Sequence, residues 1–373
     1  MGGEALLRLR CASCGLVYGV EDALKSGWLC PRCGGLPRSE FSGFWDPAGE
    51  GLIRYSSALP VTPTATLGEG GTPLVVREFF GVRAYLKLEY LNPSGSFKDR
   101  GTSLTVALAK ALGVRRLVED TSGNTGISVA TYSAAGGLEC VITLPRTAPK
   151  GKKDLLRALG AEVVEAGSRG EAAALAPRLA RERGGMHVRH TVNPLYIDGA
   201  RTVAYEAFEQ GFRGAHVVVP VGSGGLILGI YEGFRDLLRW GLIEELPAVH
   251  AVEDASLTRI AVRRRVGWGR GGGGAADALL VPNPPRAGEV VEAVDSTGGS
   301  SVAVTSAEVA EAVRTLVKSG FIVEPTSAAA LAGLKLLVEE GVVGRGDEVL
   351  VPLTGSGLKV IDELLSLTRF ESG

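Results

Sequence analysis

Lys98 is the residue of this sequence best placed for nucleophilic chemistry. It lies in the stretch Asn92-Pro-Ser-Gly-Ser-Phe-Lys-Asp-Arg-Gly101, after an alternating apolar run at 82–88 and before a run with helical spacing at 102–112. These patterns predict a strand, a turn and a helix, with Lys98 near the helix N-terminus. Because the positive end of a helix disfavours an ammonium ion, the amine is expected to have a lowered pKa and to form a Schiff base readily. A surface lysine on a first helical turn is the alternative.

Three loops could hold an anion or face a ring nitrogen. Gly222-Ser-Gly-Gly225 lies between a strand-like run and an apolar helical run, where consecutive N–H groups suit one phosphate. The loop lacks the lysine of a P-loop and the G-x-G-x-x-G spacing, so neither a triphosphate nor a dinucleotide is favoured. Ser122-Gly-Asn-Thr125 could bind a carboxylate, and Thr354 offers a neutral hydroxyl after a late strand.

Each loop is a weak motif alone, because glycine turns are common at the strand ends of α/β proteins. A reactive lysine combined with a monophosphate loop is more specific. The combination points to pyridoxal phosphate, whose aldehyde needs an amine and whose phosphate needs a set of N–H donors.

Four of the five cysteines form two C-x-x-C pairs, each followed by glycine. Fifteen residues separate the pair Cys11 and Cys14 from the pair Cys30 and Cys33. This spacing lies at the short edge of the four-thiolate zinc pattern and predicts a closed, structural zinc site. Two disulfides or four unligated thiols are the alternatives. Cys140 lies in a strand-like run and is expected to be a small core residue.

The four histidines form no comparable pattern. His187 and His190 lie three residues apart in a strand-like stretch, 186–192, with no acidic partner at metal spacing. A second metal site is therefore not predicted there. His216 begins a predicted strand and His250 ends one, and both are expected to be structural.

Length and charge exclude several kinds of partner. The chain has 373 residues, of which 45% are apolar and 22% charged, and its net charge is −1. It is long enough for two domains with their own cores and a small appendage. Without a basic stripe, a membrane-length apolar run or a signal peptide, nucleic acid and membrane partners are not expected, and the cytoplasm is the default location. Arginine exceeds lysine about threefold and glutamine occurs once, which fits a thermophile or a GC-rich genome, with a slight preference for the thermophile.

The elements that must position these residues alternate regularly along the chain. Short valine-rich runs, each followed by a loop and mostly by an apolar helical run, occur at 116–119, 140–144, 162–165, 216–220 and 348–352. This alternation predicts an α/β fold whose parallel sheets carry ligands at the carboxyl ends of their strands. The stretch 41–66 is interpreted as a connecting arm with one weak strand at 53–55, and 267–274 as a mobile surface loop.

Six motifs follow one another in an order known from one enzyme family. They are Leu91 to Gly101, Ser122 to Gly126, Thr191 to Pro194, Gly222 to Leu226, Val323 to Ala330 and Leu353 to Lys359. Over about 68–359 the sequence resembles the fold-type II pyridoxal-phosphate enzymes (tryptophan synthase β-like), and among them threonine synthase most closely. The four-cysteine segment is also similar to the N-terminal segment of many archaeal and plant threonine synthases.

The resemblance implies a role for each matching residue. Lys98 would carry the cofactor and later act as general base at the substrate's α-carbon. Asn124 would hydrogen-bond the cofactor's 3-hydroxyl, and Thr354 would face the pyridine nitrogen. The cofactor phosphate would be bound by Gly222, Ser223, Gly224, Gly225 and Leu226. Ser122 and Thr125 would receive the substrate carboxylate, and Lys87 and Thr191 would serve a substrate phosphate.

The resemblance also implies an activity, a domain plan and an assembly. The leading activity is conversion of O-phosphohomoserine and water to threonine and phosphate. Alternatives are β-replacement on O-phosphoserine, deamination of threonine or serine, and a non-catalytic homologue. The predicted domains are a zinc segment at 1–40, a large cofactor-binding domain at 41–121 and 200–373, and a small mobile domain at 122–199. The substrate would be a small amino acid, and the chain would form a homodimer.

Two departures from threonine synthases bear on the substrate. Tyr196 stands where that family usually has an arginine that can bind the substrate phosphate. The loop at Gly222 is closer to the cysteine synthase and dehydratase form. Both departures favour a test of several substrates.

Overall fold

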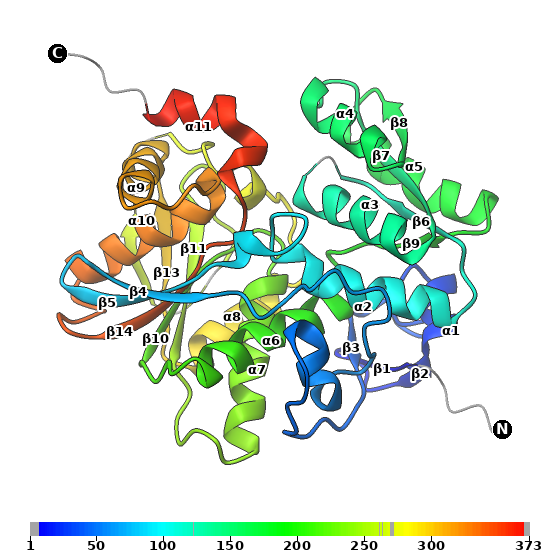
Figure 1. The fold of residues 1–373 in the computed structure, drawn as a ribbon. Helices are drawn as coiled ribbons and strands as arrows, with labels where there is room; N and C mark the ends of the chain where they lie inside the picture. Colours follow the sequence, from blue (N-terminus) through cyan, green and yellow to red (C-terminus); the bar gives the residue numbers. More distant parts are fainter. Residues whose placement is uncertain (1–6, 122, 261, 263, 269–271, 369–373) are drawn as a thin grey trace. The chain divides into compact units, whose positions relative to one another are not determined.

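The structure, a computed structural model, describes residues 7–121, 123–260, 262, 264–268 and 272–368 (Figure 1). Contacts divide the chain into unit 1, residues 1–71 and 98–199, and unit 2, residues 72–97 and 200–373. The predicted domain boundaries differ from this division for 41–71 and 98–121, which the division groups with 122–199. The last part of the predicted loop at 267–274 is described, but 269–271 lie outside the described residues.

Unit 1 begins with a small antiparallel sheet of order β2-β1-β3. Its elements are β1 (Arg8–Cys11), β2 (Val17–Gly19), α1 (Val20–Lys25) and β3 (Pro37–Ser39). The predicted weak strand at 53–55 is wrong, because these residues belong to the 3-10 helix η1 (Gly51–Ala58). Inside that helix Leu52 and Tyr55 are buried, which is a helical spacing rather than the alternation of a strand.

The main sheet of unit 1 is parallel and has the order β8-β7-β6-β9. Its strands are β6 (Arg116–Glu119), β7 (Glu139–Pro145), β8 (Glu162–Ala166) and β9 (Met186–His187). The helices are α2 (Lys98–Ala111), α3 (Asn124–Gly136), α4 (Lys150–Ala158) and α5 (Arg169–Glu182), and α6 (Leu195–Glu209) leads into unit 2. Strand β9 is much shorter than the predicted stretch 186–192, because the chain turns after His187 and Arg189 takes a positive φ of 48°.

Unit 2 is built on a seven-stranded sheet of order β12-β13-β11-β10-β14-β5-β4, parallel except for the edge strand β4. Its strands are β4 (Leu74–Phe79), β5 (Val82–Lys87), β10 (His216–Pro220), β11 (Ala248–Asp254), β12 (Arg265–Trp268), β13 (Ser301–Val304) and β14 (Glu348–Pro352). Strands β5 and β14 are neighbours although more than 250 residues separate them (Figure 1). His250 lies inside β11 rather than at its end, and Gly267 belongs to β12 rather than to a loop.

Helices complete unit 2 and cover its apolar strands. They are α7 (Gly225–Arg239), α8 (Ala287–Ser296), α9 (Ser306–Lys318), α10 (Pro325–Glu339) and α11 (Ile361–Thr368), with 3-10 helices η2 (Glu89–Leu91), η3 (Asp277–Leu279) and η4 (Gly357–Val360). The buried core joins Val218, Val252 and Val349 of the sheet to Leu331 and Leu334 of α10. The α/β class with parallel sheets is thus confirmed.

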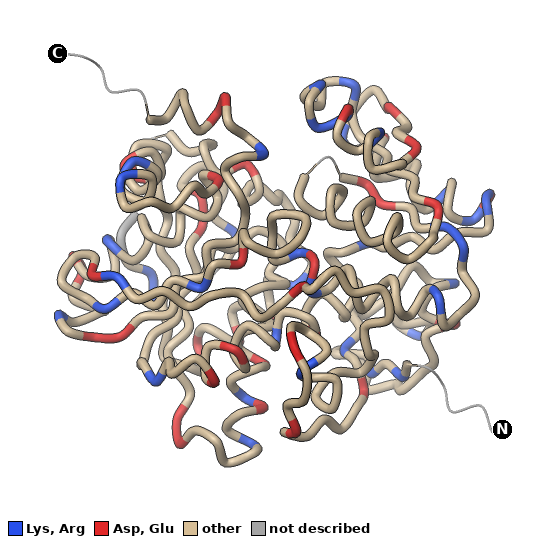
Figure 2. Tube along the Cα trace, viewed as in Figure 1, with Lys and Arg blue, Asp and Glu red and all other residues tan. Residues whose placement is uncertain are grey.

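Charges and hydropathy agree with the composition. Acidic and basic residues are interspersed along the trace in Figure 2, in keeping with a net charge of −1. Within the described parts of the chain, no helix combines the length and apolar character needed to cross a bilayer.

Candidate active site

Three loops of unit 2 gather at one edge of its sheet. Strands β5, β14 and β10 are parallel neighbours, so the loops at their carboxyl ends lie on the same side. The loop after β5 is joined to the loop after β14 by backbone bonds from Phe97 N to Thr354 O (3.1 Å) and from Ser356 N to Gly95 O (3.0 Å). Phe97 precedes Lys98 in the chain, so the peptide that leads to this lysine is held at Thr354.

The loop after β10 has the features of a phosphate site. Helix α7 begins at Gly225, and its N-cap residue, Gly224, has a φ of 91° and supplies no side-chain cap. A Cβ on Gly222 would lie 2.2 Å from the carbonyl oxygen of Ala278, so only glycine fits there. A Cβ on Gly225 would meet nothing within 4 Å, so the first turn of the helix faces open space. An uncapped helix N-terminus with room in front of it fits a phosphate.

Thr354 lies in a buried, neutral environment at the same edge. Only 2% of the residue is exposed, and its Oγ1 lies 2.9 Å from Oγ of Ser327. Ser327 in turn accepts a hydrogen bond from the backbone N–H of Gly355 (2.8 Å). The hydroxyl group of Thr354 is thereby fixed in place without a formal charge, which fits the expected partner of a pyridine nitrogen.

Leu226, the last residue of the predicted phosphate loop, is buried in the first turn of α7.

Unit 1 contributes two helix N-termini that carry predicted site residues. Lys98 is the first residue of α2, and Asn124 is the first residue of α3, which packs against α2. The helix of Lys98 thus starts four residues before the predicted run at 102–112. In the same turn of α2, the buried carboxylate of Asp99 accepts a 2.6 Å hydrogen bond from Ser128 of α3. This bond fixes the first turn of α2 to α3.

The predicted carboxylate loop is only partly described. Ser122 lies outside the described residues. Thr125 is 3% exposed at the start of α3, and Thr191 lies in a turn after β9. The N–H of Gly123 donates to Oγ1 of Thr121 (3.1 Å), and a Cβ on Gly126 would lie 2.5 Å from the Thr121 carbonyl oxygen. Thr121 therefore lies close to the first turn of α3.

Tyr196 is enclosed in unit 1. It is 4% exposed, and its hydroxyl lies 3.0 Å from Oγ1 of Thr102, which in turn lies 2.9 Å from Oγ of Ser128. A Cβ on Gly101 would lie 2.6 Å from Cα of Tyr196, so the ring packs directly on α2. Burial and, to a lesser degree, the negative charge of Glu119 raise the pKa of Tyr196 well above its ordinary value. The phenol of Tyr196 is therefore a neutral group.

Lys87 of unit 2 is fully buried and already has three acceptors. Its Nζ lies 2.7 Å from Oε2 of Glu206 and 3.0 Å from Oε1 of Gln210, and it donates to the carbonyl oxygen of Thr72. Glu206 itself is 2% exposed. An ammonium group has three N–H donors, so this ion pair satisfies them inside unit 2.

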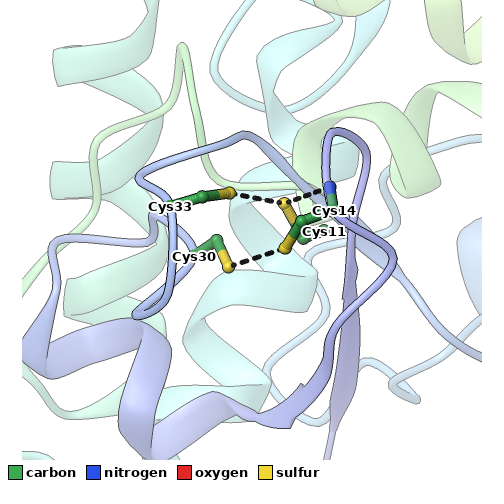
Figure 3. Close-up of side chains that lie close together, drawn as sticks. All are labelled: Cys11, Cys14, Cys30 and Cys33. Carbon is green, nitrogen blue, oxygen red and sulfur yellow. Dashed lines mark hydrogen bonds between the residues drawn. The ribbon is translucent and has the colours of Figure 1, made fainter.

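The four cysteines of the N-terminal segment converge (Figure 3). Sγ of Cys11 lies 3.5 Å from Sγ of Cys33, and Sγ of Cys14 lies 3.7 Å from Sγ of Cys30. Burial opposes ionisation of Cys11, but the N–H groups of Cys14 and Ser13 outweigh it and lower the pKa of its thiol to about 7. The neighbouring thiols outweigh the N–H of Gly35 and raise the pKa of Cys33 to about 12. Four sulfurs this close cannot all be thiolates without a cation, and the set fits a closed tetrahedral metal.

A further group of side chains escaped the sequence reasoning. Glu119, Asp120 and His187 offer ligand atoms that lie within 4.8 Å of one another. Burial favours the neutral form of Glu119, but the charges of His190 and His187 and a hydrogen bond from His190 outweigh it and lower the pKa of this carboxyl. Glu119 ends β6, Asp120 follows it, and His187 ends β9, so the signal lies in strand pairing and not in spacing along the chain.

Comparison with known proteins identifies the family. Residues 65–355 match the family model described as pyridoxal-phosphate dependent enzyme. The chain belongs to this family. It is 34% identical to the threonine synthase of Methanocaldococcus jannaschii, over 94% of this chain and 92% of that protein. It is also 34% identical to the threonine synthase of Halalkalibacterium halodurans, over 83% of this chain and 89% of that protein.

Solved structures agree with this assignment. O-ureido-L-serine synthase is 26% identical and superposes with a TM-score of 0.67, over 81% of this chain and 94% of that chain. A cysteine synthase from Entamoeba histolytica, at 22% identity and a TM-score of 0.65, shares the fold. The predicted fold-type II class is confirmed. The pyridoxal-phosphate enzyme described here is a lyase that resembles threonine synthases.

Proposed function

We propose that this enzyme converts O-phosphohomoserine and water to threonine and phosphate. The observation that carries the proposal is the 34% identity to a threonine synthase over 94% of this chain and 92% of that protein. The same proposal assigns the enzyme to amino-acid biosynthesis, with a small amino acid as substrate.

The residues of both units fit pyridoxal phosphate. The uncapped start of α7 would hold the phosphate group through the backbone of Gly222 to Gly225, and Asn124 would hydrogen-bond the ring hydroxyl. When bound, the cofactor supplies an electron sink for charge that develops at the substrate's α-carbon. Thr354 keeps the environment of the ring nitrogen neutral, which suits elimination and replacement better than transamination.

Lys98 would hold the cofactor and then move a proton at the substrate's α-carbon. Ser122 and Thr125 would orient the substrate carboxylate, and Thr191 would contact its phosphate. Lys87 was predicted to bind that phosphate as well. Its buried ion pair with Glu206 competes with that role. Substitution of Lys87 should lower stability if it serves the ion pair and should raise the KM for the phosphate substrate if it binds the phosphate.

Two other activities remain to be tested, β-replacement on O-phosphoserine and deamination of free threonine or serine. The side chain of Tyr196 is buried and neutral, so it offers a phosphate at most one uncharged hydrogen bond. Replacing a bidentate arginine by a phenol removes about 1.5–3 kcal/mol, or roughly one to two decades of affinity for a phosphate. A site weakened in this way would bind phosphoserine less well too, so Tyr196 by itself favours free threonine or serine, which carry no phosphate.

The decisive assay offers the enzyme several substrates in parallel. These are phosphohomoserine, phosphoserine with sulfide or sulfite, and free threonine or serine, with phosphate and keto acid as readouts. We expect phosphohomoserine to have the highest kcat/KM. A tenfold or larger preference for phosphoserine with a sulfur nucleophile would replace the proposal by β-replacement. Formation of keto acid from free threonine, a substrate that carries no phosphate, would indicate a dehydratase.

We further propose a structural zinc ion at Cys11, Cys14, Cys30 and Cys33. Protein purified without chelator should hold a zinc ion that the double variant Cys11→Ser/Cys14→Ser lacks. Cys140→Ala, which removes a buried thiol outside this cluster, is the matched control and should keep the metal. Since a structural site contributes folding energy, the double variant should lose stability before it loses chemistry. Retention of zinc by the double variant would contradict the assignment.

The resemblance and the composition support three further proposals, on assembly, location and stability. The chain would form a homodimer, which sedimentation can test. It would act in the cytoplasm, where the four thiols stay reduced. The low glutamine content and the excess of arginine fit a thermophile as well as a GC-rich genome, and a melting temperature above about 65 °C would favour the thermophile.

A further inference from the structure

Two neighbouring strands of unit 1 end in residues that bind metals in many proteins. Strand β6 ends at Glu119 and is followed by Asp120, and β9 ends at His187. The two strands are parallel, with Val118 paired to His187. Their carboxyl ends therefore lie together although the chain between them is long.

The three side chains form a compact group. Each offers one ligand atom, and these atoms lie within 4.8 Å of one another. Nε2 of His187 lies 3.1 Å from Oδ1 of Asp120, and Nδ1 of His190 lies 2.6 Å from Oε1 of Glu119. The Glu119 side chain is 0% exposed, whereas those of His187 and Asp120 are 12% and 27% exposed. The group is thus buried at one end and open to solvent at the other.

One oxygen of the group lacks a partner. Oε2 of Glu119 is buried and has no hydrogen-bond partner among the described residues. Burying a carboxylate oxygen without a donor or a cation is costly, and buried polar atoms are nearly always satisfied. This oxygen belongs to the most buried member of the group, so it points to a positively charged ligand.

We propose that Glu119, Asp120 and His187 bind a divalent metal ion of the zinc or manganese type, at a site separate from the four cysteines. One imidazole and two carboxylates suit zinc and manganese better than calcium or magnesium, which prefer oxygen ligands alone. Three protein ligands leave room for water in the coordination sphere.

The surrounding charges permit a dication. Glu119 and Asp120 bring two negative charges, and the guanidinium of Arg189 lies close enough to interact with both. That guanidinium donates to the carbonyl oxygen of Gly27, so it is held by the N-terminal segment. The two carboxylates together carry more charge than the single guanidinium of Arg189. The second account of the same geometry is a hydrogen-bonded cluster that needs no ion.

Manganese distinguishes the two accounts, because thiolates bind it poorly and the four cysteines would not compete for it. The test uses the full-length, zinc-loaded holoenzyme in phosphate-free buffer, titrated with Mn²⁺ and followed by loss of the free-ion EPR signal. We expect one Mn²⁺ per chain and a rise in melting temperature with Mn²⁺ concentration. Zn²⁺ and Co²⁺ should bind at the same place in equilibrium dialysis.

The variants assign the binding to these residues. Asp120→Asn and His187→Gln should each weaken Mn²⁺ binding at least tenfold and abolish the rise in melting temperature. Glu139→Gln is the matched control, since Glu139 is a carboxylate of the neighbouring strand whose partner is Arg116. It should leave binding unchanged. Far-UV circular dichroism checks the fold of each variant, and Asp120→Asn keeps both size and shape.

Two results would overturn the proposal. One is the absence of binding by Mn²⁺, Zn²⁺ and Co²⁺ beyond the metal held by the four cysteines, at concentrations up to about 1 mM, where the binding free energy falls to about 4 kcal/mol. The other is binding that Asp120→Asn and His187→Gln both leave unchanged. Either result would identify the group as a hydrogen-bonded cluster.

Discussion

Unit 2 contains two places that the sequence predicted to bind phosphate, and the structure gives them opposite characters. At the glycine loop, the start of α7 has no side-chain cap, and a Cβ on Gly225 would meet no atom within 4 Å. At Lys87, the ammonium is fully buried and lies 2.7 Å from the carboxylate of Glu206. The glycine loop offers backbone N–H donors at a helix start without a side-chain cap, whereas the N–H donors of Lys87 already have acceptors.

The comparison shows that a positive charge is a weaker sign of an anion site than unsatisfied N–H groups. Backbone donors at a helix start cannot be neutralised by a nearby acid, whereas a lysine can. If this reasoning holds, the glycine loop governs cofactor affinity and Lys87 governs stability. Four substitutions or conditions test the difference.

The largest effect is expected for Lys98→Ala, which leaves both places intact. Turnover should fall by at least 10²–10⁴-fold, because the variant has lost its nucleophile and general base. Pyridoxal phosphate should still bind, since the glycine loop remains. Absorbance spectra and equilibrium dialysis measure the cofactor, and product release measures turnover.

Borohydride provides the control for this first prediction. In the wild-type enzyme it should fix the cofactor to Lys98, as peptide mapping would reveal. Label on another lysine would contradict the assignment. Complete loss of cofactor from Lys98→Ala would mean that the glycine loop does not hold the phosphate without the lysine.

The next effect concerns Lys87→Ala. Removing Lys87 takes away the ammonium that lies 2.7 Å from the buried carboxylate of Glu206, so the free energy of unfolding should fall by about 3–5 kcal/mol. Denaturant unfolding measures this loss. The double variant Lys87→Met/Glu206→Gln removes both charges with little change in volume and should recover most of the stability.

The same variants test the predicted substrate role of Lys87. If Lys87 serves only the ion pair, the double variant should also recover the KM for phosphohomoserine. A KM that stays tenfold or more above the wild-type value, at recovered stability, would instead assign Lys87 to the substrate phosphate.

Sequence patterns predicted the parts of this molecule that depend on near neighbours. The four cysteines lie within 23 residues, and the glycine loop joins a strand directly to a helix, so short spacing was sufficient. The partners of Lys87 could not be predicted in this way. Glu206 lies in the last turn of α6 and Gln210 directly follows that helix, more than 100 residues from Lys87 in sequence, and only the fold brings them to β5.

The acidic group of unit 1 shows the same limit. The spacing of His187 and His190 suggested no acidic partner, because Glu119 and Asp120 are nearly 70 residues away. Parallel pairing of β6 with β9 places them together. Periodicity predicts that strands exist, but it does not predict which strands become neighbours.

A smaller effect is expected when a methyl group is added to the open glycine loop. Gly225→Ala is compatible with a helical backbone and meets no atom, so folding should be unchanged. The methyl group would occupy space in front of the helix start and should weaken pyridoxal-phosphate binding about 10–100-fold, or roughly 1.4–2.7 kcal/mol. Gly288→Ala, at an equally open position in the first turn of α8, is the matched control. Equal cofactor affinity in both variants would remove the glycine loop from the site.

The smallest effect is a pH dependence of stability. It arises at His250 and His216 of unit 2, a second polar group that, like Lys87, already has hydrogen-bond partners. Nδ1 of His250 accepts from the backbone N–H of Ser300 (3.1 Å), so its proton is on Nε2, which donates to Nδ1 of His216 (3.1 Å). Nε2 of His216 then faces Asp347 at 3.4 Å. This chain of bonds requires a neutral His250. Burial is the main cause that lowers the pKa of His250 to about 3, and the positive charge of Arg264 acts in the same direction.

The sign of the pH effect follows from that lowered pKa. As pH falls below about 6.5, the unfolded chain binds a proton at His250 and the folded chain does not, so stability is complete above this pH and is lost towards pH 3. At pH 5 the loss from this residue is about 2 kcal/mol. Urea unfolding at pH 7.5 and pH 5.0 should show a smaller difference in His250→Gln than in the wild-type enzyme, because glutamine does not titrate. His250 belongs to the interior and not to the glycine loop. Any change in cofactor affinity between pH 7.5 and pH 5.0 should therefore be the same in the wild-type enzyme and in His250→Gln. A change in affinity confined to the wild-type enzyme would connect this histidine pair to the phosphate loop and break the distinction between the two kinds of polar group.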